Sequence, residues 1–284
     1  MTAPEFRSGW YPVMRSAALK RAPVQRTLAG TALQLSRASG GGLVATEPGT
    51  GHPRLAAEQD GWIFAAIGEA APGPVSERPL IHSASQQLQI EGTVRAGLGD
   101  VGENILDTTH TSVVHRDYLR RPGERRRIDA VLASGEEWVS ATYPQGAAPG
   151  GWGARLLGAH RYAITDTFRA PAIAEVSYME MREPVFAARF WLTPVSDRET
   201  YVAATLAVPG TGWAARLKLA ALRLFFLRIF AEDRAILEMI DINRSAHGAA
   251  PLVFAPQDLL RPGINAILDG RRPLASDTHI ALKI

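Results

Sequence analysis

The chain has 284 residues, of which 46% are hydrophobic and 21% charged, and its 31 basic and 28 acidic residues leave a formal charge of +3. This composition excludes a disordered or fibrous chain, and so small a net charge gives no reason to expect a nucleic-acid partner. The sequence contains no cysteine, which excludes disulfides, thiolate zinc sites, cysteine nucleophiles and cysteine-ligated iron–sulfur clusters within these residues.

Short runs typical of β-strands, broken by glycine and proline, fill the first part of the chain. They are Trp10–Val13, Ala32–Ser36, Leu43–Thr46 and, after an Asp60-Gly61 turn, Trp62–Ile67. Residues 69–80 hold three prolines and few large apolar side chains, which is the composition of a connection between lobes. We therefore expect a small β-rich domain over residues 1–75 and a second domain over residues 76–284.

The second domain is predicted to contain a meandering antiparallel sheet, because strand-like runs recur at the spacing of hairpins. These runs cover residues 86–94, 126–133, 137–143, 160–169, 173–182, 185–193 and 199–208. Residues 185–192 mix small and large side chains, as expected for one face of a sheet packed under a helix.

A long helix is predicted from Trp213 to about Asn243, where the sequence has no glycine or proline and its leucines, alanines and charges recur at helical spacing. Its cations, Arg216, Lys218, Arg223 and Arg228, do not gather on a single polar face, so we expect a helix that covers the sheet and not a membrane helix. The proline-containing tail should hold one short helix near Gln257–Leu260.

The sequence favours a soluble cytoplasmic protein without a membrane or nucleic-acid partner. The N-terminal residues contain no apolar run of signal-peptide length, and no stretch approaches the roughly 20 uninterrupted apolar residues of a spanning helix. The basic cluster at Arg116, Arg120, Arg121 and Arg125–Arg127 could attract an acidic substrate or redox partner. It lacks the interleaved aromatic residues of a nucleic-acid platform, and we expect a solvated loop.

The first candidate functional residues lie in the segment Glu103–His115, where Asp107 is followed by His110 and His115. On an α-helix Asp107 and His110 share a face, because three residues advance about 300°, whereas His115 lies about 140° from His110. Thr111–Val114 are poor helix formers, and an end of the helix there would let both imidazoles converge. Two convergent histidines with a carboxylate and open positions are typical of non-haem Fe(II) that activates dioxygen.

A carboxylate on the long helix is the candidate third ligand. Asp233 has Ile229 and Ile236 at positions i−4 and i+3, so it lies on or beside the face that should be buried against the sheet. A buried carboxylate needs a partner, and a metal ion is one. Glu232 or Glu238 could replace Asp233 as the ligand.

The same residues also permit a structure without a metal. In that alternative Asp107 and His110 form a buried hydrogen-bonded pair, and Asp233 forms a salt bridge with Arg228 or Arg234. The spacing of Asp107, His110 and His115 is nevertheless fairly specific, because few chains of this composition contain it by chance.

The segment NILDTTHTSVVH, followed later in the chain by EDRAILE, resembles the catalytic domain of Rieske non-haem iron aromatic ring-hydroxylating oxygenase α subunits, in their smaller monooxygenase and O-demethylase branch. Gly9–Val13 is similar to the opening strand of that family, and Pro53–Phe64 is similar to the last strands of its Rieske domain. The resemblance implies that His110, His115 and Asp233 bind a mononuclear Fe(II).

Two further site residues follow from this resemblance. Asp107 matches the bridging aspartate of the family, which hydrogen-bonds a ligand histidine and links it to the Rieske cluster of a neighbouring subunit. Orienting a ligand histidine is a role that such a carboxylate can fill at any metal site. Asn104 occupies the family's position near the iron.

The cluster-binding part of that family is missing here. A Rieske [2Fe-2S] centre needs two cysteines and two histidines, whereas this chain has no cysteine and only a short segment, Ser36–Pro53, where both cluster loops should lie. His52 remains in that segment, and we expect an exposed loop histidine. The implied fold is α+β, with a truncated, cluster-free β lobe followed by a helix-grip antiparallel sheet covered by the long helix.

Dioxygen activation in this family needs two external electrons, which leaves three functions open. The first is an oxygenase component for an aromatic or hydrophobic small molecule, oligomeric and supplied with electrons by a Rieske-containing homologous subunit or a reductase. The second is a non-redox metalloenzyme, a lyase, hydratase, isomerase or hydrolase, because a Lewis-acidic metal with open positions needs no reductant. The third is a catalytically silent binding subunit.

Overall fold

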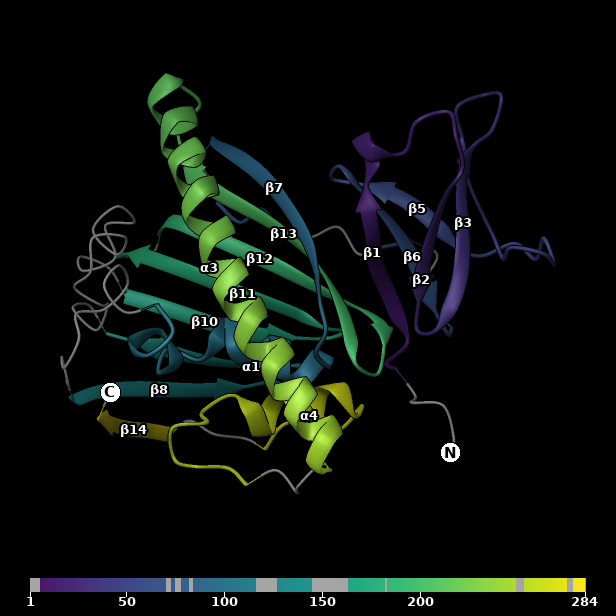
Figure 1. The fold of residues 1–284 in the computed structure, drawn as a ribbon. Coiled ribbons are helices and arrows are strands. Elements are labelled where there is room, and N and C mark those ends of the chain that lie inside the picture. The colour runs from purple at the N-terminus through teal and green to yellow at the C-terminus, as the bar shows by residue number, and fades with distance from the viewer. Residues whose placement is uncertain are drawn as a thin grey trace.

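The computed structural model describes residues 6–69, 73–74, 78–81, 84–115, 127–144, 163–181, 183–248, 253–274 and 278–283. Its largest element is an eight-stranded antiparallel sheet crossed by one long helix, with two three-stranded sheets at its side (Figure 1). The α+β fold class with antiparallel sheets and a long helix near the C-terminus is confirmed. Most of the basic cluster, all of it except Arg127, lies outside the described residues.

The N-terminal part of the chain forms two small sheets. The strand orders are β1-β6-β5 and β2-β3-β4. The bounds are β1 Gly9–Arg15, β2 Val24–Leu28, β3 Thr31–Arg37, β4 Leu43–Thr46, β5 Ala56–Gln59 and β6 Trp62–Ile67. The predicted Asp60-Gly61 turn joins β5 to β6 with φ of 51° and 79°, the conformation that a two-residue hairpin turn needs. Strand β2 was not predicted, because its polar residues give little apolar alternation, whereas β5 lies within Pro53–Phe64, where only the family resemblance implied strands.

The eight-stranded sheet has the order β14-β8-β9-β10-β11-β12-β13-β7. The bounds are β7 Ser85–Val94, β8 Arg127–Ser134, β9 Trp138–Tyr143, β10 Ala163–Arg169, β11 Ile173–Glu180, β12 Glu183–Ser196, β13 Glu199–Pro209 and β14 Thr278–Lys283. All seven strands predicted in the second domain are present, and β14 was not predicted. Pairing of Asp166 with Val176 and of Ile164 with Tyr178 sets the register of β10 and β11, so these side chains share the face that the helices cover.

The long helix α3 spans Trp213–His247, four residues beyond its predicted end. Gly212 precedes its first turn and Gly248, with φ of 81°, ends it, because a glycine adopts this left-handed conformation without strain. The face packed on the sheet consists of Ala215, Leu219, Leu222, Phe225 and Leu237, at helical spacing. No helix among the described residues is both long enough and apolar enough to cross a membrane.

The two shorter helices differ from the predictions. Helix α1 (Leu98–Leu106) lies between α3 and the sheet and ends before Asp107, earlier than the expected end at Thr111–Val114. The short helix predicted at Gln257–Leu260 is wrong: α4 spans Arg261–Leu268. A proline lies in its first turn, where a backbone N–H has no partner within the helix and its loss costs nothing. The predicted position holds only the end of a turn, in which the N–H of Asp258 donates to the backbone oxygen of Ala255 at 3.0 Å.

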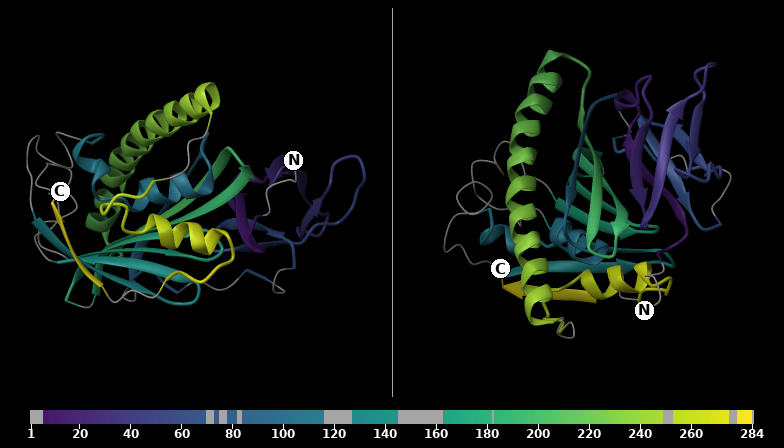
Figure 2. Two further views of the ribbon diagram at one scale, coloured as in Figure 1. Left: turned by 90° about the horizontal axis from the view of Figure 1, so that it is seen from below. Right: turned by 45° about the vertical axis from the view of Figure 1, so that its right-hand side comes forward.

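The N-terminal sheets pack against the face of the large sheet that the helices do not cover. Trp10, Trp62 and Phe64 form one buried apolar cluster with Ile173 and Trp191 of the large sheet. Figure 2 shows the two parts side by side from further directions. The division at residues 75 and 76 stays a prediction, since the two parts share this cluster.

Candidate metal centre

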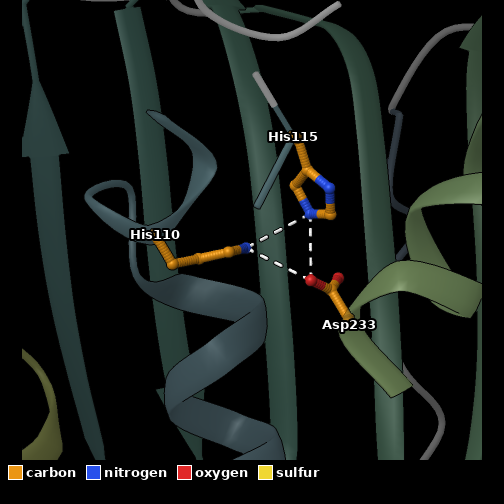
Figure 3. A group of neighbouring side chains, drawn as sticks. All are labelled: His110, His115 and Asp233. Carbon is orange, nitrogen blue, oxygen red and sulfur yellow. Dashed lines mark hydrogen bonds and ion pairs between the residues drawn. The ribbon is translucent and has the colours of Figure 1, made fainter. Parts of the chain in front are cut away.

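Three donor atoms converge between α1 and α3, as Figure 3 shows. The distances are 3.3 Å from His110 Nε2 to His115 Nε2, 3.4 Å from His110 Nε2 to Asp233 Oδ1, and 2.9 Å from His115 Nε2 to Asp233 Oδ1. The side chain of His115 is 1% exposed, and those of Asp233 and His110 are 14% and 15% exposed. The structure therefore brings together the three residues that the sequence analysis named as metal ligands.

The turn that follows α1 places both imidazoles. The carboxylate of Asp107 accepts the backbone N–H of Thr109 at 2.7 Å and that of His110 at 3.1 Å, so it ends the helix and begins a tight turn. A 3₁₀ turn, His110–Ser112, follows and leads to His115. The loosening of the helix that convergence requires is thus present, three residues before His110.

The outer ring nitrogen of each histidine faces an oxygen. His110 Nδ1 lies 2.5 Å from the backbone oxygen of Asp107, and His115 Nδ1 lies 3.0 Å from Glu232 Oε2. Both oxygens are acceptors, so each Nδ1 donates its proton to its outer partner, and with a metal ion bound the two Nε2 atoms would turn their lone pairs to the centre. This is how an outer partner prepares a histidine to bind a metal ion.

Glu232 is the site residue whose role the sequence analysis missed. It was considered only as a substitute ligand, whereas its carboxylate contacts His115 on one side and Arg228 Nη2, at 3.1 Å, on the other. Its position next to Asp233 on α3 is the only signal in the sequence, and helical geometry alone points adjacent side chains about 100° apart.

Within the described residues, the two arginines that the metal-free alternative assigned to Asp233 form salt bridges with other carboxylates. Arg228 pairs with Glu232, and Arg234 pairs with Glu238 at 2.8 Å, so Asp233 faces the histidines instead. Burial raises the pKa of Asp233, but hydrogen bonds and charge from the two histidines lower it by more, and its pKa lies below the ordinary value. Burial lowers the pKa of His115, but Asp233 and Glu232 raise it by more.

The separations of the donor atoms fit a divalent metal ion. Ligand atoms at about 2.1 Å from an ion lie about 3.0 Å apart at neighbouring octahedral positions and about 3.4 Å apart at tetrahedral positions. The three observed separations, 2.9, 3.3 and 3.4 Å, fall within or next to this interval. Two imidazole nitrogens and one carboxylate oxygen are also the donor chemistry of non-haem Fe(II).

Asn104 and Asp107 lie next to this group. Asn104, on α1, places Nδ2 3.5 Å from Asp233 Oδ1. The carboxylate of Asp107 is 3.9 Å from His110 Nδ1, so the close contact to this imidazole comes from the backbone oxygen of Asp107 and not from its side chain. The side chain acts on His110 by holding the turn.

An apolar cavity of about 160 Å³ adjoins the three donor residues. It lies between the sheet and the two helices α1 and α3, and His110, His115 and Asp233 are part of its wall. Aromatic side chains form much of the rest: Phe186 stacks on Phe226 with ring centroids 5.6 Å apart. An apolar cavity with a few convergent polar groups is the usual form of a small-molecule site.

The comparisons with known proteins agree with this fold. Dicamba monooxygenase bound to dicamba is similar to this chain with a TM-score of 0.74 and 14% identity, over 92% of this chain and 95% of that one. The terminal oxygenase of carbazole 1,9a-dioxygenase from Nocardioides aromaticivorans IC177 has a TM-score of 0.63 and 14% identity, over 94% and 95%. The oxygenase in its complex with ferredoxin in carbazole 1,9a-dioxygenase has a TM-score of 0.62 and 13% identity, over 96% and 91%.

At the level of sequence, no curated protein matches the chain. Residues 94–260, well over half of the chain, match the family described as the vanillate O-demethylase oxygenase C-terminal domain. That range contains α1, both histidines and Asp233. The chain therefore belongs to the vanillate O-demethylase oxygenase C-terminal domain family, within the Rieske oxygenases that its sequence resembles.

Proposed function

We propose that the chain is a non-haem iron oxygenase component that acts on an aromatic or other hydrophobic small molecule. The observation that carries the proposal is the convergence of His110 Nε2, His115 Nε2 and Asp233 Oδ1 at the wall of an apolar cavity. These three residues would hold Fe(II), which supplies a place where dioxygen binds and is reduced next to the substrate.

The other residues of the site would orient the ligand histidines, hold the substrate and exclude bulk water. The backbone oxygen of Asp107 and the carboxylate of Glu232 fix the two imidazole rings, and Asn104 lies within reach of Asp233. The aromatic wall around Phe186 and Phe226 would hold a flat apolar substrate and keep bulk water away. The similarity to proteins that bind dicamba and carbazole supports an aromatic substrate.

Electrons must reach this site from another protein. Insertion of one oxygen atom of O₂ into a substrate with reduction of the other to water consumes two electrons and two protons. With no cysteine, the chain has no [2Fe-2S] cluster of its own. We propose a separate Rieske-bearing subunit or reductase as the donor, in an oligomer or a transient complex, in a cytoplasmic setting. The oxygenase–ferredoxin complexes among the similar structures support a protein donor.

Metal content tests the ligand assignment. After anaerobic reconstitution with Fe(II), the native chain should bind about one iron per chain. His110→Ala, His115→Ala and Asp233→Ala should each lose most of the iron, and without metal each should unfold at nearly the same temperature as the metal-free native chain. Glu238→Ala, on the same helix but paired with Arg234, is the matched control and should keep it. Full iron binding in all three ligand variants would contradict the site.

Electron supply is tested on the same protein. Asp107→Asn should keep most of the iron, because the amide oxygen can still accept a backbone N–H of the turn. The variant should lose turnover if electrons reach the metal through this residue. A Rieske spectrum should appear only in preparations that contain a second protein. Stoichiometric iron with no oxygen consumption under any reductant or partner would contradict the oxygenase proposal.

A non-redox metalloenzyme is the second candidate, and the absence of cysteine favours it. The same ligand set with open positions can polarise a carbonyl group or activate water without external electrons. Activity on an aromatic substrate that survives replacement of Fe(II) by Zn²⁺, under anaerobic conditions, would support this candidate over the first.

A further inference from the structure

Helix α3 has a second apolar face, opposite the one that packs on the sheet. Trp213, Leu217 and Leu224 are 79%, 63% and 69% exposed. At 100° per residue they lie within about 40° of one another around the helix axis. The same direction holds the exposed Ala220 and Ala231. Beyond them it carries Glu238, which pairs with Arg234. We call this face, from Trp213 to Ala231, the outer stripe; it lies on the side of α3 away from the large sheet, which α3 crosses in front in Figure 1.

The outer stripe is flanked by cations. Arg216 and Arg223 lie along one edge and Arg228 along the other, all exposed. Residues 213–231 contain these three arginines and Lys218 and no aspartate or glutamate. The first acidic residue of α3 is Glu232, which turns toward the metal centre. More than half of the helix therefore presents leucine, alanine and tryptophan between arginines, without an exposed carboxylate.

This charge pattern argues against a second copy of the same helix as the partner. Two copies paired through residues 213–231 would bring six arginines together, three from each copy, which costs free energy at an apolar interface. The pattern fits an anionic bilayer surface, where the apolar face enters the headgroup boundary and the arginine side chains reach the lipid phosphates. A large exposed apolar patch usually marks a surface that binds a protein or a membrane.

We propose that the outer stripe of α3 binds the surface of anionic phospholipid membranes, with the helix parallel to the bilayer plane. This revises the expectation of no membrane partner, which considered the spread of the cations around the helix and not the exposed apolar stripe that three of them flank. The residues from Trp213 to Ala231 span about 28 Å along the helix axis, so the stripe can lie across several lipid headgroups at once. The helix stays outside the hydrocarbon core, in agreement with the finding that it cannot span a membrane. The proposal does not depend on the reaction at the metal centre.

Co-sedimentation with vesicles tests this surface. The full chain should bind vesicles of phosphatidylcholine with phosphatidylglycerol, should bind pure phosphatidylcholine more weakly, and should be released by high salt. Leu217→Gln/Leu224→Gln should weaken binding roughly tenfold or more by removing apolar insertion. Arg216→Gln/Arg223→Gln should weaken it about fivefold per arginine on anionic vesicles and far less on neutral ones.

A control variant distinguishes binding through the outer stripe from non-specific hydrophobic binding to vesicles. Leu55→Gln/Leu274→Gln removes two exposed leucines outside α3 and should leave vesicle binding unchanged. Thermal unfolding of each variant checks that it is folded. Absence of binding to anionic vesicles overturns the proposal. So does a native oligomer that Leu217→Gln/Leu224→Gln dissociates while vesicle binding persists, because the outer stripe would then be a protein interface.

Discussion

The two candidate ligand histidines have different outer partners, a neutral backbone oxygen for His110 and a carboxylate for His115. A carboxylate stabilises positive charge on the imidazole more strongly than a carbonyl does, and it makes the facing Nε2 a better donor to a metal ion. Glu232 is in turn held by Arg228, which fixes its direction. We therefore expect the affinity for the metal ion to depend on Glu232 although it is not a ligand.

Glu232→Gln should weaken Fe(II) binding by about 10- to 100-fold while the stoichiometry at saturating iron stays the same. The amide keeps the size of the side chain but removes the charge that supports His115. Titration of the metal-free protein with Fe(II) under anaerobic conditions measures this, and Glu238→Gln is the matched control. An unchanged dissociation constant would mean that Glu232 plays no part in metal binding.

Asp166, on β10, is a buried acid near the site and is 3% exposed. Among the described residues its Oδ1 has no hydrogen-bond partner. Burial, and then repulsion from Asp107, raise its pKa well above the ordinary value of 3.8. A carboxyl whose pKa is raised by folding adds most stability below the unfolded pKa, and this stability is lost as pH rises through the folded pKa.

Asp166→Asn should therefore be as stable as the native chain near pH 4 and more stable at alkaline pH, by about 1.4 kcal/mol for each unit by which folding raises the pKa. The amide stays neutral and has the same shape. Urea unfolding of both proteins over this pH range, with chelator present throughout, gives the difference. Asp197→Asn, which removes an exposed carboxylate, is the control. A difference that does not change with pH would show that Asp166 is not strained by burial.

At the scale of elements, the cavity depends on how closely α3 approaches the sheet. Gly92 on β7 faces Phe230 of α3, and a Cβ atom at this position would lie 2.5 Å from Phe230 Cε1. Such a contact is far inside van der Waals distance, so the ring or the helix would have to move. The missing side chain of Gly92 thus lets Phe230 form part of the cavity wall.

Gly92→Ala should destabilise the chain by about 1–3 kcal/mol, the usual cost of overpacking. Phe230→Leu in the same chain should recover part of this loss, because the shorter side chain makes room. A double-mutant cycle by urea unfolding measures the coupling. Gly42→Ala, where the added Cβ meets nothing within 4 Å, is the control. Additive effects of the two substitutions would contradict the contact.

Helices and strands could be told apart from the sequence wherever apolar side chains recur at a regular spacing. The strands of the large sheet and α3 follow from runs whose side chains alternate or recur every three to four residues. The short helix at Arg261–Leu268 was misplaced because the signal for its start is a proline within its first turn, not before it. Strand β14 (Thr278–Lys283) depends on pairing with β8, a contact across more than half of the chain that local pattern does not reveal.

The three candidate ligands of the site could be named from the sequence because of their chemistry and spacing. His110, His115 and Asp233 were found from chemistry and spacing, and the family resemblance supplied their roles. The role of Glu232 and the backbone contact of Asp107 could not be found, because both depend on the exact direction of α3 relative to the turn after α1. Such directions are set by tertiary packing.

At the scale of the whole molecule, the N-terminal sheets and the large sheet are joined by more than apolar contact. Thr193 Oγ1 on β12 donates to the backbone oxygen of Pro12 on β1 at 2.6 Å, and both atoms are buried. The backbone N–H groups of Ala29 and Gly30 donate to Pro194 and Val195, at 2.7 and 2.8 Å. We expect the two parts to unfold together.

Thr193→Val should lower the free energy of unfolding by about 1–3 kcal/mol, because the oxygen of Pro12 loses its buried donor while the shape is kept. The urea transition should remain single, with tryptophan fluorescence and circular dichroism coinciding. Two separate transitions, of which Thr193→Val shifts only one, would show that residues 1–75 and 76–284 are independent folding units.

The positions of the three donor residues along the chain also bear on folding. His115 and Glu232 are 117 residues apart, and Asp233 comes next. An ion bound by both segments closes this loop, and in the chain-entropy view a crosslink across about 100 residues removes roughly 4–5 kcal/mol of freedom from the unfolded chain. A protein without cysteine has no covalent crosslink of this kind, so the metal would act as a reversible one that also fixes the wall of the cavity.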